Sequence, residues 1–204
     1  MSTATVTPIG RTRWRRFGAM MGIVIAVAAG LILLTGKGVL AVSFSISGMP
    51  FTVTSPRLHG YGFEQFATLD EMAPDSPNSG DTGGQMILIV SAINDAELSR
   101  LCQSINLGGT NLRITAGSDK VPVTAERLVV DSDLITGDAE FNSIDIGQDS
   151  STLDQVPGIK GGLGVFGQQA DEVTINNLRQ NNYATTAATF RLPNLRMGFD
   201  DRGC

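Results

Sequence analysis

The chain has 204 residues, of which 42% are hydrophobic and 17% charged, and its formal net charge is −5. Once an N-terminal segment is set aside, this length allows one domain with a buried core. Residues 1–40 contain five Lys and Arg and no acid, whereas residues 41–204 contain ten Lys and Arg against twenty Asp and Glu, a net charge of −10. Such an acidic domain repels nucleic acid and anionic lipid headgroups, which argues against nucleic acid as its partner.

An apolar segment near the N-terminus predicts a membrane anchor. Residues 17–36 carry no charge and follow three closely spaced arginines. As a helix, this segment would rise about 30 Å, which matches the hydrocarbon thickness of a bilayer. Because basic residues beside a membrane segment stay in the cytoplasm, we expect residues 1–16 to be a cytoplasmic basic tail and residues 42–204 an extracytoplasmic domain. A signal peptide cleaved after Ala41, which would release a secreted domain, is the alternative.

The rest of the chain shows mainly the period-two alternation of β-strands. Residues 86–93 (MILIVSAI) are apolar on both faces and predict a central strand. Residues 94–105 stay open between a short helix and a strand, because their leucines have helical spacing while Ala96-Glu97 resembles Ala-acid pairs elsewhere in the chain. Further strands are predicted at 44–47, 51–54, 112–116, 121–130, 137–147, 173–175, 184–192 and 195–199.

Two long polar stretches predict flexible loops. Residues 74–84 have almost no apolar side chain, and residues 147–169 are rich in Gly, Ser and Asp. The fold class is therefore mainly β, with one N-terminal transmembrane helix followed by a single all-β domain. An elongated sandwich and a β-solenoid-like coil both fit the pattern.

Both cysteines, Cys102 and Cys204, lie in the part that we expect to be exported. An even pair of cysteines in an oxidising compartment favours a disulfide over two free thiols. Two cysteines and one histidine do not supply the four ligands of a structural zinc site. We therefore predict a Cys102–Cys204 bridge and no cofactor.

His59 is the only histidine and so the only candidate base for a serine-hydrolase triad. The chain has no Gly-x-Ser-x-Gly elbow to carry a nucleophile. A histidine in a turn is the simpler interpretation, and the chain is therefore interpreted as non-enzymatic. The string at residues 162–167 (GLGVFG) matches GxGxxG, but its surroundings predict a loop and not a dinucleotide site.

Three aspartates form the only metal candidate that the sequence offers. Asp131, Asp133 and Asp138 supply oxygen ligands of the kind that calcium prefers. Their spacing is not that of an EF-hand loop, since Leu134 and Ile135 follow Asp133. Acidic turns between strands are common solvated features, so the expectation is no metal, with this trio as the alternative.

Several stretches together resemble a known family. They are SFSISGMPFTVTS, HGYGFEQF, LCQSI, LRITAG, PVTAERLVVDSDLITGDAEFNSIDIGQD, FGQQADEV and TTAATFRLPNL before a terminal cysteine. In these stretches the chain resembles an uncharacterised actinobacterial family of membrane-anchored exported proteins. Some members of that family are labelled cholesterol esterase, a label for which the residues quoted give no mechanism. The resemblance therefore carries no catalytic residue over to this chain.

The expected function is that of a membrane-anchored cell-envelope protein. The β domain would bind or scaffold an integral membrane protein or a lipid at the outer face of the cytoplasmic membrane, an expectation that rests on architecture alone. An exported lipase or esterase is the alternative, and it requires a hydroxyl within reach of His59 and an acid behind the ring.

Overall fold

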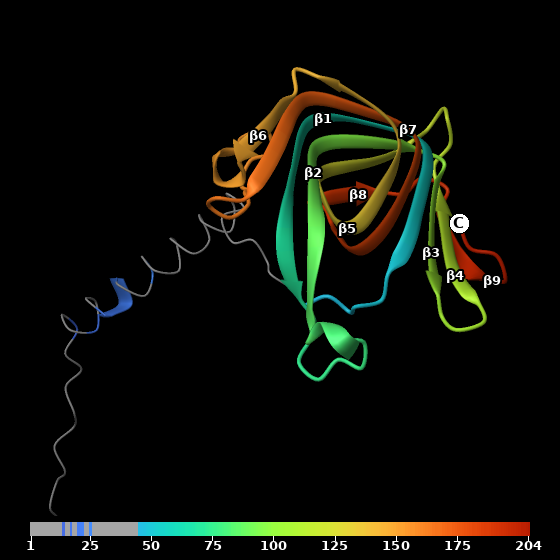
Figure 1. The fold of residues 1–204 in the computed structure, drawn as a ribbon, viewed down its shortest axis with the longest axis horizontal. Helices are drawn as coiled ribbons and strands as arrows, with labels where there is room; N and C mark the ends of the chain where they lie inside the picture. Colours follow the sequence, from blue (N-terminus) through green and yellow to red (C-terminus); the bar gives the residue numbers. More distant parts are fainter. Residues whose placement is uncertain (1–13, 15–16, 18–19, 23–24, 26–44) are drawn as a thin grey trace, which may run out of the picture. The chain divides into compact units, whose positions relative to one another are not determined.

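Four long strands form the centre of the fold: β1 (Phe51–Glu71), β2 (Gln85–Ser99), β5 (Val123–Asn142) and β7 (Phe166–Thr186). Buried and exposed side chains alternate along these segments, as is typical of β-strands. All the pairings between the four strands are antiparallel. β2 lies between β1 and β5, β7 lies beside β5, and β7 also pairs with β1. The four strands therefore close into a ring, here called the closed ring (Figure 1).

The computed structural model describes residues 45–204 and six isolated residues near the N-terminus: Trp14, Phe17, Met20, Met21, Gly22 and Ile25. The predicted segment 17–36 and the cleavage position after Ala41 lie, apart from those isolated residues, outside the described part. No helix within the described residues has the length and apolarity that crossing a membrane requires.

The remaining elements are short. They are β3 (Leu101–Asn106), β4 (Asn111–Ala116), β6 (Asp145–Asp149), β8 (Thr189–Arg191), β9 (Arg196–Asp200) and two 3-10 turns, η1 (Gly80–Thr82) and η2 (Ser150–Thr152). The sheet runs β6-β7-β5-β2-β1-β3-β4-β9, with β8 beside β5. β3, β4 and β9 thus extend from β1 as a three-stranded projection, here called the wing (Figure 1).

Left-handed residues interrupt the long strands and let them curve. Gly62, Arg127 and Asn177 have φ values of 65°, 48° and 54°, and each is skipped in the pairing register of its strand. Gly62 and Arg127 are skipped opposite Asn94, so the ladder is interrupted there without an inserted residue. Near Asn177 the register of β5 with β7 shifts as at a β-bulge, which bends a strand and increases its twist. Strands of 20 or 21 residues far exceed the usual length. The bends explain how strands of this length wrap around one narrow interior.

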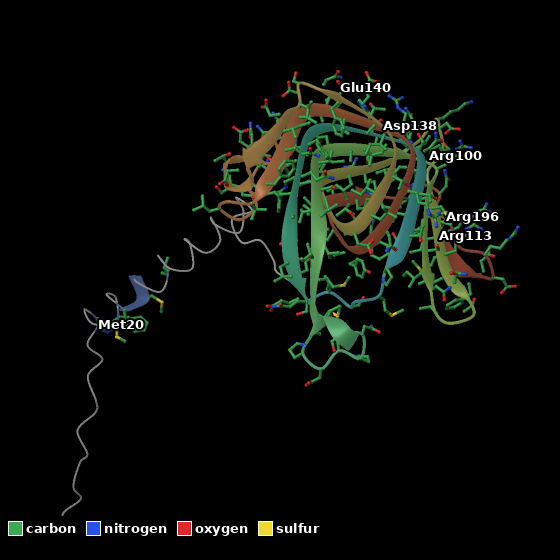
Figure 2. The ribbon with its side chains drawn as sticks, in the orientation of Figure 1. Met20, Arg100, Arg113, Asp138, Glu140 and Arg196 are labelled. Carbon is green, nitrogen blue, oxygen red and sulfur yellow. A yellow bond between two sulfur atoms is a disulfide. The ribbon has the colours of Figure 1, made fainter. Side chains whose placement is uncertain are left out.

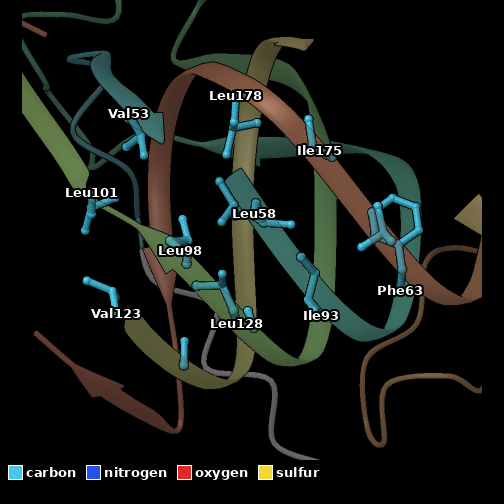
Figure 3. Close-up of a cluster of buried hydrophobic side chains, with 14 of the residues drawn as sticks. Val53, Leu58, Phe63, Ile93, Leu98, Leu101, Val123, Leu128, Ile175 and Leu178 are labelled. Atoms are coloured by element: carbon cyan, nitrogen blue, oxygen red, sulfur yellow. The ribbon is translucent and has the colours of Figure 1, made fainter. Parts of the chain in front are cut away.

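The interior of the closed ring is filled by apolar side chains that alternate with outward polar ones. Leu58, Ile93, Leu128 and Leu178 come from four different strands, pack together and are at most 4% exposed (Figure 3). Gly60 lies beside Ile93, and a Cβ at this position would collide with the Ile93 side chain, so the packing requires glycine here. The centre of the ring is therefore closely packed.

The structure confirms a mainly β domain and corrects its architecture. The strands belong to one antiparallel sheet that closes on itself, and not to a sandwich or a solenoid. Residues 94–105, left open between helix and strand, are the end of β2 and most of β3, separated by left-handed Arg100. The stretch 147–169 contains the end of β6, η2 and the start of β7, so the GxGxxG string runs into a strand.

A buried carboxylate holds the irregular chain between η2 and β7. Glu64 is fully buried, and its carboxylate accepts a hydrogen bond of 2.7 Å from the backbone N–H of Val156. Asp149 accepts backbone hydrogen bonds from Ser151 (3.0 Å) and Gly164 (2.8 Å) at the two ends of this chain. The segment covers Phe66 and Val90 with Leu153, and so adds a small second core outside the ring.

The predicted disulfide is present and fastens the C-terminus to the wing. Cys102 of β3 and Cys204 are bonded, with their Cα atoms 5.9 Å apart. The Cys204 amide donates to Ser104 Oγ (2.9 Å), and Arg179 Nη1 donates to the Cys204 backbone oxygen (3.0 Å). The last residues thereby link β3 to β7 across the outer face of the sheet.

Removing this bridge should destabilise the domain. The two cysteines are 102 residues apart, and a loop of that size corresponds to about 4–5 kcal/mol in the chain-entropy account. For the double variant Cys102→Ser, Cys204→Ser we expect a loss of about 3–5 kcal/mol in urea unfolding of the full chain in detergent. Dithiothreitol should destabilise the wild type and leave the variant unchanged. Equal wild-type stability with and without reductant would contradict the role assigned to the bridge.

Candidate functional site

His59 lies on the outer face of the closed ring, between β7 and β2. Its register partners are Thr174 on one side and Glu97 on the other. His59 Nδ1 is 3.0 Å from Thr174 Oγ1, and Nε2 is 3.5 Å from a Glu172 carboxylate oxygen. The histidine is therefore in a strand and not in a turn, with a hydroxyl and an acid on its two ring nitrogens.

The backbone of β7 beside His59 is paired on both sides. β7 pairs at Thr174 with His59 on one side and with Glu140 of β5 on the other. In a strand paired on both sides, backbone amides are committed to the ladders and do not point at a reacting oxygen. A hollow of about 480 Å³ lies beside the His59 imidazole, and its lining includes the acids Asp95, Glu97 and Glu126.

The three aspartates of the calcium alternative face different partners. Asp133 accepts hydrogen bonds from Asn181 Nδ2 (2.8 Å) and Tyr183 Oη (3.3 Å), whereas Asp138 accepts one from Asn177 Nδ2 (2.9 Å). Among residues 45–204 and the six isolated positions, no group of three or more His, Cys, Asp or Glu is arranged to hold a metal ion.

Asp131 is instead part of a half-buried pair of acids. Burial, reinforced by the negative charge of Asp70, raises the pKa of Asp131 to about 7. Burial also raises the pKa of Asp70. Asp131 stands opposite Val90 and Ala184 in the sheet, so its carboxylate lies among apolar neighbours. The folded chain consequently favours the protonated form of Asp131.

The raised pKa of Asp131 predicts a pH-dependent stability. The folded pKa of about 7 exceeds the ordinary value of 3.8, so the stabilisation is full below pH 4 and is lost as the pH rises through 7. Replacing Asp131 by Asn should remove this dependence and raise the free energy of unfolding at pH 8 by on the order of 1–2 kcal/mol. Urea unfolding at pH 5 and pH 8 measures it, with Asp138→Asn as the exposed control. Identical pH profiles for wild type and Asp131→Asn would contradict the assignment.

An open groove lies where the wing meets the end of the closed ring, and we call it the wing groove. Its volume is about 560 Å³. The residues that line it come from the described start of the chain, from β1, from β3 and from the segment after Asn182; they include Ile46, Phe51, Gln103, Tyr183, Ala187 and Phe190. The walls therefore combine apolar and aromatic side chains with the hydroxyl groups of Ser45, Ser47 and Thr185 and with one amide.

The face of the wing that carries Gln103 continues this apolar surface. Ile105 pairs with Leu112, and Leu112 pairs with Phe199, so the three form one row across β3, β4 and β9. Met197 lies in the next row and is 62% exposed, while Phe199 is 74% exposed. Large apolar side chains that stay exposed in a contiguous row are typical of a binding surface.

The opposite face of the wing carries charged side chains. Arg113 and Arg196 project from β4 and β9 on the face that carries the disulfide, and Arg100 precedes β3 (Figure 2). Arg113 pairs with Asp200 at 3.0 Å. Arg100 pairs with Asp119 at 3.1 Å, so the wing has an apolar face toward the groove and a charged, partly ion-paired face away from it.

These features define an all-β protein with one self-closing antiparallel sheet, a disulfide-fastened wing and an apolar groove between them. The chain belongs to a family of unknown function, DUF6230, whose profile matches residues 47–204. That range includes every strand of the described fold. Searches of curated proteins and of solved structures found no match. The sequence resemblance is thus confirmed as far as membership in a family of unknown function.

The sequence predicted the disulfide and singled out His59 as a candidate base, but it did not predict the wing groove. The groove joins residues near 46, 103 and 187, which are distant in the sequence and have no shared motif. The alternation of Leu195, Met197 and Phe199 was a usable signal, because an apolar face in the last strand needs a covering surface. Thr174 carried no signal, since only the register of β1 with β7 brings it to His59.

Proposed function

We propose that this chain is a non-enzymatic, membrane-anchored cell-envelope protein that binds the hydrocarbon part of a lipid in the wing groove. The observation that carries the proposal is the groove itself, an open space of about 560 Å³ between the wing and the ring. Small-molecule sites have volumes of about 300–1,000 Å³ and mostly apolar linings. The apolar row on the wing lengthens the contact available to an extended chain.

The anchor rests on the sequence of residues 17–36, with the basic tail at residues 1–16 inside the cell and the β domain outside. The described chain begins at Ser45, and Ser45 lines the groove. Cleavage after Ala41 would give a secreted carrier with the same groove.

An integral membrane protein is the other occupant considered for the same surface. The groove and the exposed Met197 and Phe199 would then bind an apolar helix of that partner. A lipid is favoured because the volume suits a single hydrocarbon chain better than the 10–12 Å diameter of a helix.

Blocking the groove should abolish lipid binding. In Ala187→Trp an indole fills part of the groove, whereas Leu163→Trp places the same ring at a site that is 87% exposed. With the full chain reconstituted in phosphatidylcholine vesicles, a photoactivatable hexadecyl probe should label residues 183–190 in the wild type and in Leu163→Trp. Labelling of Ala187→Trp should fall at least tenfold. Equal labelling of both variants would overturn the groove as the binding site.

A second candidate function is hydrolysis of esters, as in an exported lipase or esterase. It is favoured by one observation: His59 lies between the Thr174 hydroxyl (3.0 Å) and the Glu172 carboxylate (3.5 Å). An acyl-transfer site also needs donors for the oxyanion, which the paired amides of β7 do not supply.

Ester hydrolysis should therefore be negligible. We expect wild type, His59→Ala and Thr174→Val to hydrolyse short-chain nitrophenyl esters at one and the same background rate. A wild-type rate at least a hundredfold above that of both variants would establish the esterase and remove the non-enzymatic proposal.

A further inference from the structure

Amide side chains occupy the end of the ring interior that opens toward the wing groove. The inward row of β7 is apolar at Val173, Ile175 and Leu178 and then changes to Gln180 and Asn182. Gln103 of β3 and Gln180 of β7 are both register partners of Val53, so they flank it in one row. The apolar interior of the closed ring thus ends in a group of amide side chains, Gln103, Gln180 and Asn182, here called the amide floor.

Asn182 has a polar atom without a partner. The residue is 1% exposed, and its Oδ1 atom is buried without a hydrogen bond to any residue that the structure describes. A buried amide oxygen without a donor costs about 1–3 kcal/mol, and native folds leave few of them. Asn182 lines a small space of about 30 Å³ in the ring interior.

This small space adjoins the wing groove. Gln103, Thr185 and Phe190 line both of them. Phe190 is 40% exposed, so its ring is not locked in the core. The two spaces therefore meet at these three side chains, and Asn182 lies on the inner side of this boundary.

The lining also determines the charge of the ligand. None of the described residues that line the small space or the wing groove is charged. Burying a carboxylate or a phosphate there would have no compensating cation. The partner of an amide oxygen is a donor, and a neutral hydroxyl donates without carrying charge into the interior.

We propose that the wing groove selects a neutral single-chain amphiphile whose hydroxyl donates a hydrogen bond to Asn182 Oδ1. This inference rests on the proposed lipid-binding function and specifies its ligand. The hydroxyl end lies in the small space below Phe190, and the alkyl chain runs along the groove toward the apolar row of the wing. Asn182 is thereby the residue that determines specificity, while the apolar walls supply the affinity.

The test compares three photoactivatable sixteen-carbon probes on the full wild-type chain in phosphatidylcholine vesicles. The probes are an alcohol, its methyl ether, which accepts a hydrogen bond but cannot donate one, and the corresponding carboxylate. A hydrogen bond to a buried acceptor changes affinity about tenfold. We expect the alcohol to label residues 183–190 about tenfold more strongly than the ether, and more strongly than the carboxylate.

Two variants assign the preference to one side chain. Asn182→Leu should lower labelling by the alcohol to the level of the ether and leave the ether unchanged. Asn181→Leu, one residue away on the outer face, should keep the tenfold preference. An intact Cys102–Cys204 bridge, seen on non-reducing gels, and an unchanged near-ultraviolet circular dichroism spectrum report that each variant is folded.

The outcomes separate the two proposals. Equal labelling of the wild type by alcohol and ether overturns the hydroxyl inference and leaves the groove as an apolar site. Absence of groove labelling by all three probes overturns the lipid-binding function itself. If Asn182→Leu does not fold, the alcohol-to-ether ratio of the wild type still decides the inference.

Discussion

The pairing of β7 with β1 is the constraint on which the rest of the structure depends. It runs from Phe51 opposite Asn182 to Phe66 opposite Gly167, so β1 is paired on both sides over most of its length. Closure gives the four long strands an inside and an outside and removes their free edges. The edge strands of the described sheet are β6, β8 and β9, and β9 belongs to the wing. Ligand surfaces are consequently expected at the ends of the ring, where its packed interior meets short strands.

Closure also explains how the charges are distributed. Each long strand alternates between the packed interior and the outer face, so acids that follow a buried alanine point outward. Ala96 and Ala125 are both 3% exposed and are register partners, while Glu97 and Glu126 lie outside. Glu64 departs from this pattern: burial raises its pKa, and the carboxylate is occupied in holding the chain at Val156. The net negative charge is therefore mainly a property of the outer surface.

The sequence predicted the mainly β class and the disulfide, because alternation and cysteine usage are local or compositional signals. It did not predict the length of β1, which extends from Phe51 to Glu71. It did not predict closure, since no local signal pairs Phe51 with Asn182. The resemblance of Ala96-Glu97 to Ala125-Glu126 reflects cross-strand pairing, since Ala96 and Ala125 are register partners. Residues 94–105 stayed ambiguous because left-handed Arg100 divides the stretch between two strands. The amide floor of the groove was hidden for the same reason, as Gln103 and Gln180 meet only across β1.

The same hydrogen-bond arrangement that argues against chemistry argues for binding. Where a strand is paired on both sides, as β7 is at Thr174 beside His59, its backbone amides are used within the sheet and are not directed at a reacting oxygen. Buried side-chain polar atoms are likewise expected to have hydrogen-bond partners, and Asn182 Oδ1 is an exception. An apolar residue at that position would avoid the cost of an unpaired amide. A bound hydroxyl would offset that cost, and this gives a physical reason for keeping an asparagine where the ring opens into its groove.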